Sequence, residues 1–252
     1  MRELEQEITG GIAVLTLNVP GKKNALTDVL RSELRQALLE AQQDESVRAL
    51  VLTGAGGAFC SGGDISAMTA DPEIAVRRMT ILHDVVRMLV AGAKPSVAAV
   101  NGPAFGAGFS LAMCCDQVVA DRTARFCASF SRMGLPPDLG LAWTLPRRVG
   151  AARAGRLLLG GRLVDHAEAM SLGLVDLEAE PGNLVAAAIE RAREMASDSL
   201  ESKAHVKKLL DVAGGRIEAT LEAEMQSYLA LLGSREHIEA REAFLAASRK
   251  KG

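Results

Sequence analysis

The sequence has few aromatic residues and almost no excess of either charge, and both shortages exclude classes of protein. Aromatic residues make up 3% of the 252 positions, too few for a platform on which nucleic-acid bases stack. The formal net charge is −2 and the isoelectric point is about 6.1, so the chain lacks the basic surface that nucleic acids require. No run of the sequence approaches the ~20 apolar residues of a membrane span. We therefore expect neither a nucleic-acid nor a membrane partner.

Cysteine is also scarce, and its positions predict neither disulfides nor a metal site. The four cysteines are Cys60, Cys114, Cys115 and Cys127, and none of them forms a Cys-x-x-Cys pair. No His, Asp and Glu cluster has the spacing of metal ligands. The first residues, MRELEQEITG, contain no apolar core of signal-peptide length. These features predict reduced thiols, no bound metal and a cytoplasmic protein.

The first half of the chain repeats one unit, in which a strand is followed by a glycine-rich loop and a helix. Thr27 has the residue type of a helix N-cap, and Asp71-Pro72 is typical of a helix start. Apolar periodicity predicts strands within 3–18, at 47–54, at 95–102 and at 116–121, and helices at 28–43, 72–89 and 106–115. This alternation predicts an α/β domain in which helices pack on sheets.

From about residue 151 onward, helical patterns dominate. They cover 151–159, 165–171, 182–196, 200–212, 216–232 and 235–248. No low-complexity linker separates the halves, so the pattern leaves two organisations open: one domain with a helical extension, or two domains. Apolar residues of the tail, such as Leu221 and Leu229, predict packing against the rest of the chain or another subunit. We assign Tyr228 the same packing role.

Two glycine-rich loops, at 54–64 and 101–108, each follow a predicted strand and enter a predicted helix. The first N–H groups of a helix have no partner within it and attract negative charge. Neither loop has the G-x-x-x-x-G-K-[ST] or G-x-G-x-x-G spacing of nucleotide-binding loops, and neither contains a G-x-S-x-G serine. Two interpretations remain: an oxyanion hole, in which both loops donate N–H groups to one oxygen, or two tight turns.

Five longer motifs extend this reading along the whole chain. They are VPGKKNALT at 19–27, GAFCSGGDI at 57–65, AAVNGPAFGAGFSLAMCCD at 98–116, ARFCASFSRMGLPPDLGLAWTLPRRVG at 124–150 and EHIEAREAFLAASR at 236–249. With these motifs the chain resembles the enoyl-CoA hydratase/isomerase (crotonase) superfamily. The resemblance implies an α/β fold, a crotonase-like spiral of repeated ββα units with a C-terminal helical trimerisation region. We place the core at 1–195 and the extension at 196–252, in a homotrimer or dimer of trimers.

The resemblance also implies an acyl-CoA thioester as substrate, with coenzyme A entering as part of that substrate and no separate cofactor. By position in the motifs, Gly63 and Ala107 would donate the two N–H groups to the thioester oxygen. The residues expected along the substrate are Lys22, Lys23, Ala25, Leu26, Ser61, Gly62, Asp64, Ile65, Ser66, Phe105, Gly106, Ser110, Phe130, Pro137 and Phe244. The lysines would meet phosphates or simply carry solvated surface charge, and Phe244 would reach a neighbouring subunit's coenzyme A.

The sequence departs from the family pattern at the two glutamates that activate water in hydratases. Ser110 and Phe130 stand at those positions, and neither can exchange the protons that hydration requires. An acid remains at Asp138, where several isomerases of the family carry their base. Apolar neighbours such as Leu135 predict a raised pKa for its carboxyl group. The alternative is that Asp138 caps the helix expected at 139–147.

Taken together, these residues predict an enzyme, an enoyl-CoA isomerase that shifts a double bond from the 3- to the 2-position. The reaction would pass through a thioester enolate held in the oxyanion hole. Three alternatives stay open: an enoyl-CoA hydratase, another crotonase-type reaction of acyl-CoA, and an acyl-CoA-binding protein without turnover.

Overall fold

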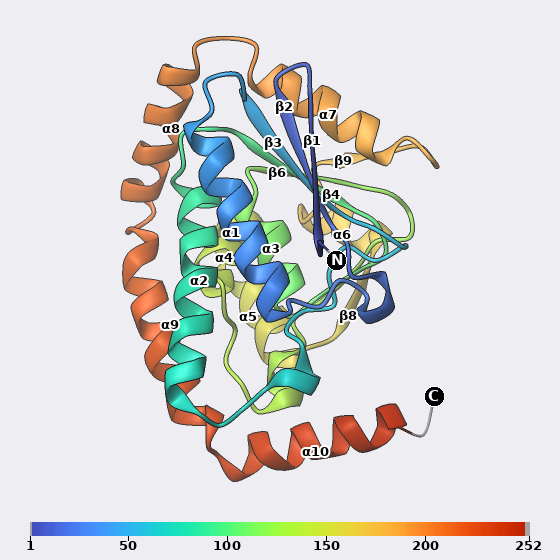
Figure 1. The fold of residues 1–252 in the computed structure, drawn as a ribbon, viewed down its shortest axis with the longest axis vertical. Coiled ribbons are helices and arrows are strands. Elements are labelled where there is room, and N and C mark those ends of the chain that lie inside the picture. The colour runs from blue at the N-terminus through green and yellow to red at the C-terminus, as the bar shows by residue number, and fades with distance from the viewer. Residues whose placement is uncertain (1, 250–252) are drawn as a thin grey trace.

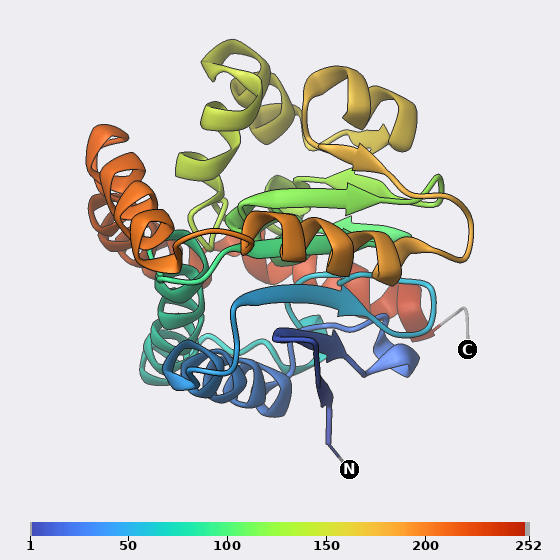
Figure 2. The same cartoon turned by 90° about the horizontal axis from the view of Figure 1, so that it is seen from above.

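A computed structural model describes residues 2–249 and contains two β-sheets. The larger has the strand order β1-β2-β3-β4-β6-β9, in which only the β1–β2 pair is antiparallel. Its strands are β1 (Leu4–Thr9), β2 (Ile12–Leu17), β3 (Ala49–Gly54), β4 (Ser96–Val100), β6 (Gln117–Ala120) and β9 (Leu177–Glu178). The smaller sheet consists of β5 (Pro103–Phe105), β7 (Arg125–Cys127) and β8 (Leu163–Asp165). Figure 2 shows the long parallel strands with helices on either side of them.

Ten α-helices surround these sheets within the described residues (Figure 1). They are α1 (Asp28–Gln43), α2 (Pro72–Val90), α3 (Ala107–Cys114), α4 (Leu141–Val149), α5 (Ala151–Gly160), α6 (His166–Leu172), α7 (Leu184–Met195), α8 (Leu200–Ala213), α9 (Ile217–Leu232) and α10 (Arg235–Arg249). Three short 3-10 helices are η1 (Pro20–Lys22), η2 (Ile65–Ala67) and η3 (Ser129–Met133). Within 2–249, no helix combines the length and apolarity needed to cross a bilayer.

The helix starts predicted from capping residues are confirmed. The Thr27 side chain accepts a hydrogen bond of 3.0 Å from the Leu30 N–H at the start of α1. Asp71 caps α2 in the same way, and Pro72 is the first helical residue. Each cap satisfies N–H groups that the helix itself leaves unpaired. These helices matter to the site because both lie over the pocket described below.

The repeated unit runs through both sheets. After β4 in the large sheet the chain adds β5 to the small sheet and then forms α3, and after β6 it adds β7 before η3 and α4. Each unit therefore supplies one strand to each sheet and one helix. β4 belongs to the large sheet and β5 to the small sheet, and only residues 101–102 separate them. The glycine-rich segment at 101–108 is therefore anchored to both sheets before α3 begins.

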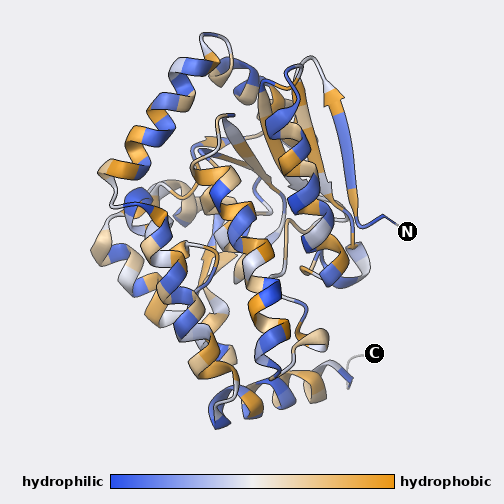
Figure 3. Ribbon diagram, turned by 60° about the vertical axis from the view of Figure 1, so that its left-hand side comes forward, coloured by the Kyte–Doolittle hydropathy of each residue, from blue (hydrophilic) through white to orange (hydrophobic). Residues whose placement is uncertain are grey.

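The large sheet is buried on both faces, as its apolar strands require. Leu50 and Leu52 of β3 face the main core beneath α1, α2 and α3, whereas Ala49 and Val51 face a second core covered by α7. In Figure 3 the strands of this sheet are largely coloured as hydrophobic, whereas the surrounding helices mix both colours. Because β3 and β4 are packed on both faces, their C-terminal ends, where the two glycine-rich loops begin, are held in place by the core.

The helical tail packs partly on the core. α9 lies beside α2 (Figure 1), and its Ile217 and Leu221 belong to the main core. α10 runs along one end of the molecule, where it contacts η2 and η3. α8 leaves Leu209 and Leu210 exposed. The boundary between 1–195 and 196–252 and the trimer both stay predictions.

Candidate functional site

A pocket lies where the two glycine-rich loops meet α1, α2, α9 and the segment before α4. Half of the residues expected at the site line this one pocket. They are Leu26, Ser61, Gly62, Gly63, Ile65, Gly106, Ala107, Phe130 and Asp138. Segments that are more than 100 residues apart in the sequence thus come together at a single cavity.

The two glycine-rich loops are hydrogen-bonded to each other directly beside the pocket. The Cys60 N–H donates to Pro103 O at 3.0 Å, and the Phe105 N–H donates to Cys60 O at 2.9 Å. Gly62 has a φ of +101°, and a Cβ there would lie 2.8 Å from Phe105 O and 3.5 Å from the nitrogen of Ala107. Glycine is therefore required at position 62 both for its backbone conformation and for the close approach of the loops.

The N–H groups of Gly63 and Ala107 are free to bind a ligand. Ala107 is the first residue of α3 and follows Gly106, whose φ is +52°. Within residues 2–249, neither N–H donates a hydrogen bond to a backbone or side-chain acceptor. The N–H of Ala107 also lies at the positive end of the α3 dipole. Gly63 and Ala107 line the same pocket, and an oxyanion hole would require both N–H groups to donate to one oxygen.

Asp138 lines the pocket, and the backbone of the two residues after it is held by hydrogen bonds to Glu224 and Cys114. The next two residues, Leu139 and Gly140, have positive φ values of 51° and 70°, a conformation that is costly for leucine. The Gly140 N–H donates to both carboxylate oxygens of Glu224, at 2.9 and 3.1 Å. The Cys114 thiol donates to Leu139 O at 3.3 Å. These contacts hold the backbone and leave the Asp138 carboxyl group unengaged.

The Asp138 residue is only partly buried, but one oxygen of its carboxyl group is buried and unpaired. Its Oδ1 is inaccessible to solvent and has no hydrogen-bond partner within residues 2–249. Burial raises the pKa of Asp138 to about 7, and the nearby charge of Arg31 opposes that rise. The raised pKa agrees with the expectation from its apolar neighbours. A carboxyl group with this pKa exchanges protons readily near neutral pH.

The capping alternative for Asp138 is wrong. α4 begins at Leu141 rather than at 139, and its N-cap residue is Gly140, which has no side chain to form a cap. Glu224 on α9 instead accepts the Gly140 N–H. A carboxylate from a distant helix has taken the role that local sequence assigned to Asp138.

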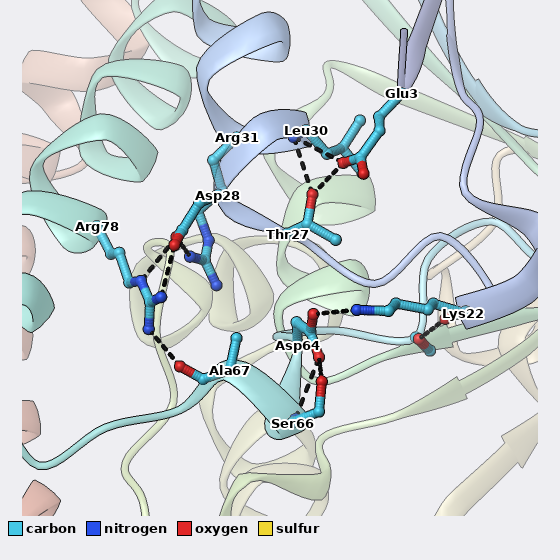
Figure 4. Close-up of polar contacts among 11 residues, drawn as sticks. Glu3, Lys22, Thr27, Asp28, Leu30, Arg31, Asp64, Ser66, Ala67 and Arg78 are labelled. Carbon is cyan, nitrogen blue, oxygen red and sulfur yellow. Dashed lines mark hydrogen bonds and ion pairs between the residues drawn. The ribbon is translucent and has the colours of Figure 1, made fainter. Parts of the chain in front are cut away.

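The remaining expected residues lie outside the pocket lining. Lys22 forms an ion pair with Asp64 at 2.7 Å, and the Ser66 hydroxyl donates to the same carboxylate (Figure 4). The Ser110 hydroxyl is fully buried and donates to Gly106 O at 3.3 Å, so it supports the second loop from behind. The others outside the lining are Lys23, Ala25, Phe105, Pro137 and the half-exposed Phe244 of α10.

Sequence reasoning missed several lining residues, above all Arg31 on α1 and Tyr228 on α9. Arg31 follows Thr27 by four positions and precedes Leu34 by three, so helical spacing places it on the buried face of α1. A charged residue at a core-facing position was the available signal. The other missed lining residues are Met68, Thr69, Ala75, Arg78, Met79, Leu82, Ser129, Met133 and Leu135.

The four thiols give no reactive group at the site. All are buried, and burial raises the pKa of Cys60 and Cys115 to about 12 and that of Cys114 and Cys127 above its ordinary value. The residues from 2 to 249 also contain no cluster of three His, Cys, Asp or Glu side chains placed to hold a metal ion.

Because thiolates are the reactive form, we expect native protein at pH 8 to incorporate less than one iodoacetamide per chain in an hour. Protein unfolded in guanidinium chloride should incorporate four, as the sequence contains four cysteines. Mass spectrometry of the intact chain counts the adducts, and the unfolded sample is the control. Rapid alkylation of Cys60 in native protein would contradict its burial.

Comparison with known proteins agrees with this geometry. A family model described as enoyl-CoA hydratase/isomerase matches residues 7–249. The 1,2-epoxyphenylacetyl-CoA isomerase of Escherichia coli is 33% identical over 98% of this chain and 96% of its own, and a probable enoyl-CoA hydratase of Mycobacterium leprae is 38% identical over 86% and 76%. A crystal structure of an enoyl-CoA hydratase/isomerase from Pseudoalteromonas atlantica superposes with a TM-score of 0.86, at 32% identity over 97% of each chain. The chain therefore belongs to the enoyl-CoA hydratase/isomerase family and has the crotonase fold.

Proposed function

We propose that this protein is an enoyl-CoA isomerase that converts a 3-enoyl-CoA into a 2-enoyl-CoA. The observation that carries the proposal is the Asp138 carboxyl group, whose Oδ1 is buried and unpaired, in the lining of the same pocket as Gly63 and Ala107, whose N–H groups have no acceptor within residues 2–249. A base beside an oxyanion site is what abstraction of a proton α to a carbonyl requires.

In the proposed reaction, the thioester oxygen accepts hydrogen bonds from the N–H groups of Gly63 and Ala107. Asp138, ionised, takes a proton from C2 of the substrate, and the electrons of that C–H bond move to make the enolate. The two N–H groups stabilise the negative charge on the enolate oxygen. Asp138, now protonated, returns the proton to C4 as the double bond forms between C2 and C3. One carboxyl group serves both steps, so the enzyme ends in its starting state.

Hydration is the second candidate, because several relatives carry the name enoyl-CoA hydratase. Adding water requires one group to take a proton from water and another to protonate carbon. Among the residues that line the pocket, Asp138 is the one carboxyl group, while Ser110 and Phe130 occupy the hydratase glutamate positions. This composition favours the isomerase over the hydratase.

The proposal extends to how coenzyme A binds. Lys22 and Lys23 would lie along it with Asp64, Ile65 and Ser66, of which Ile65 lines the pocket and Lys22 and Asp64 form an ion pair. Phe244 on α10 would meet the coenzyme A of a neighbouring subunit in a homotrimer or a dimer of trimers. Its half-exposed side chain has room for such a contact.

The test is to incubate the protein with trans-3-hexenoyl-CoA and, separately, with trans-2-hexenoyl-CoA in deuterated water. Because the two isomers have the same mass, liquid chromatography against standards should reveal 2-enoyl product from the first compound, and mass spectrometry should reveal deuterium at C2 or C4 in both. Water addition should be slower than isomerisation by at least a hundredfold. Fast hydration without isomerisation would overturn the proposal, as would the absence of both product and exchange across acyl chains of four to ten carbons.

The pH dependence follows from the Asp138 carboxyl group, whose pKa is raised to about 7. The reaction needs the ionised base, so kcat/KM should be nearly constant above pH 8 and fall about tenfold per pH unit well below pH 7. Initial rates from pH 5 to 9 at constant ionic strength measure this profile. A rate unchanged down to pH 5 would mean that the base keeps an ordinary carboxylic pKa.

A further inference from the structure

The pocket contains a buried cation that the proposed reaction does not use. Arg31 projects from α1 into the pocket lining, together with Asp138 and Tyr228, and it is 6% exposed. Its pKa is lowered because burial disfavours its charge. An arginine is rarely buried unless a partner compensates its charge. The group that compensates the charge of Arg31 therefore bears on which ligand the pocket binds.

Within the described residues, the hydrogen bonds of Arg31 are incomplete. Its Nη1 donates to Asp28 Oδ1 at 2.6 Å, whereas its Nε is buried and has no acceptor. Figure 4 shows Arg31 and Arg78 converging on Asp28 from α1 and α2. Arg31 therefore keeps donors for a further acceptor.

Asp28 cannot compensate both cations. Arg78 holds both of its carboxylate oxygens, through Nε at 2.7 Å and Nη2 at 2.6 Å, and uses Nη1 to donate to Ala67 O at 2.8 Å. Two guanidinium groups thus share the Asp28 carboxylate. The other carboxyl group near Arg31 is Asp138, whose charge acts on Arg31 but which forms no hydrogen bond with it, so the Nε of Arg31 stays without an acceptor. The Asp28 side chain is half exposed, whereas that of Arg31 is buried, so the unmatched donor of Arg31 lies on the pocket side.

Besides Tyr228 and the residues Asp138 and Arg78, whose charges act on Arg31, the pocket lining includes apolar side chains such as Met79, Leu82 and Ala75. A hydrocarbon acyl chain would cover the guanidinium group and offer no acceptor, which is unfavourable for a buried cation. A carboxylate would offer two oxygens in the planar geometry that a guanidinium group matches. Tyr228 keeps its hydroxyl proton at neutral pH, because burial raises its pKa, and it can donate a further hydrogen bond.

We propose that Arg31 binds a carboxylate at the far end of the acyl group, so that the preferred substrates are coenzyme A monothioesters of dicarboxylic acids. This inference rests on the proposed function in so far as the pocket is taken to hold the acyl group. It does not depend on which reaction occurs there, because it concerns binding at the end remote from the thioester.

The experiment compares saturated ligands, which cannot isomerise, by titration calorimetry. Each pair has the same number of acyl carbons and differs in a terminal carboxylate or methyl group: succinyl- and butyryl-CoA, adipoyl- and hexanoyl-CoA, suberoyl- and octanoyl-CoA. For the chain length that reaches Arg31, we expect the dicarboxylic ester to bind at least tenfold more tightly. Equal affinity, or tighter binding of the methyl ligand, at every length would overturn the proposal.

Variants of Arg31 test whether this residue causes the preference for a terminal carboxylate. In Arg31→Met the affinity ratio of the best pair should fall to about one or below, and in Arg31→Lys it should be intermediate, because the charge remains but the fork is lost. Arg35→Met is the matched control: Arg35 is one turn further along α1, pairs with Asp84 at 2.6 Å and lies outside the pocket. A ratio in Arg31→Met equal to that of Arg35→Met would overturn the assignment.

A neutral ligand separates charge from hydrogen bonding. The methyl ester of adipoyl-CoA keeps an oxygen acceptor but has no negative charge, and we expect it to bind the wild-type protein no better than twice as tightly as hexanoyl-CoA. If the methyl ester binds as tightly as adipoyl-CoA, the claim of an anionic substrate is wrong even if Arg31 contacts it. If Arg31→Met does not fold, the wild-type series and Arg31→Lys still decide the question. Failure of the isomerase assay would not alter any of these affinities, so the two proposals can fail separately.

Discussion

Replacing Asp138 by asparagine should reduce kcat/KM for conversion of 3-hexenoyl-CoA into 2-hexenoyl-CoA by about 10³-fold, the contribution typical of a positioned general base. Asparagine has nearly the same shape but cannot accept a proton at neutral pH. The loss should fall on kcat, with KM changed less than fivefold, because Gly63 and Ala107 still bind the thioester. Exchange of the C2 hydrogen with deuterated water should disappear in parallel, since it depends on the same proton transfer.

Asp84→Asn is the matched control, because Asp84 is an aspartate on α2 that pairs with Arg35 and Arg87 away from the pocket. Its kcat/KM should stay within twofold of the wild-type value. Retention of more than a tenth of the activity in Asp138→Asn would rule out this residue as the base. Comparable losses in both variants would point to a general electrostatic or folding effect instead.

The same substitution should increase stability at alkaline pH. The pKa of Asp138 is raised from 3.8 to about 7 in the folded protein, so between these values the folded state binds more protons than the unfolded state. The wild-type free energy of unfolding therefore decreases with rising pH, by about 1.4 kcal/mol per unit from this group. Asparagine has no such dependence, so Asp138→Asn should gain on the wild type from pH 4 to 7 in urea titrations. A variant that loses both activity and stability would indicate a structural role.

The local parts of the fold could be predicted because short-range physics decides them. Thr27 and Asp71 bind N–H groups a few residues away, so the starts of α1 and α2 are encoded within one helical turn. The small sheet could not be found this way. β5 and β8 have three residues each, show no apolar alternation and exist only because both pair with β7. Their position depends on the folded chain rather than on their own sequence.

In the candidate site, too, features set by local sequence could be predicted and features set by tertiary packing could not. Its loops could be located, since glycines at the ends of strands mark backbone that must approach another group closely, as Gly62 does. The walls could not, because Arg31 and Tyr228 reach the pocket through the packing of α1 and α9. Asp138 illustrates both cases: its raised pKa followed from apolar neighbours, whereas its capping role failed because Glu224, 86 residues later, binds the Gly140 N–H.

Gly108→Ala should disrupt the pair of loops and nearly abolish activity. A Cβ at position 108 would lie 2.1 Å from Cys60 O and 2.7 Å from the Cys60 carbonyl carbon. That carbonyl group cannot yield easily, because it accepts a hydrogen bond from the Phe105 N–H. The first turn of α3 must therefore move away from the 54–64 loop, and the N–H of Ala107 moves with it. We expect a loss of about 3 kcal/mol in the free energy of unfolding and at least a hundredfold in kcat.

Gly155→Ala is the control that isolates the steric effect from the general effect of adding a methyl group. Gly155 lies inside α5, and a Cβ there would have no atom within 4 Å apart from its own helix and chain neighbours. Alanine is the better helix former, so this variant should gain about 0.5–1 kcal/mol and keep full activity. Urea titrations measure both free energies, and rates at a temperature where Gly108→Ala remains folded separate lost geometry from lost protein. If folded Gly108→Ala retained wild-type kcat, close contact between α3 and the Cys60 carbonyl would not be needed to place the Ala107 N–H, and the oxyanion assignment would lose its structural support.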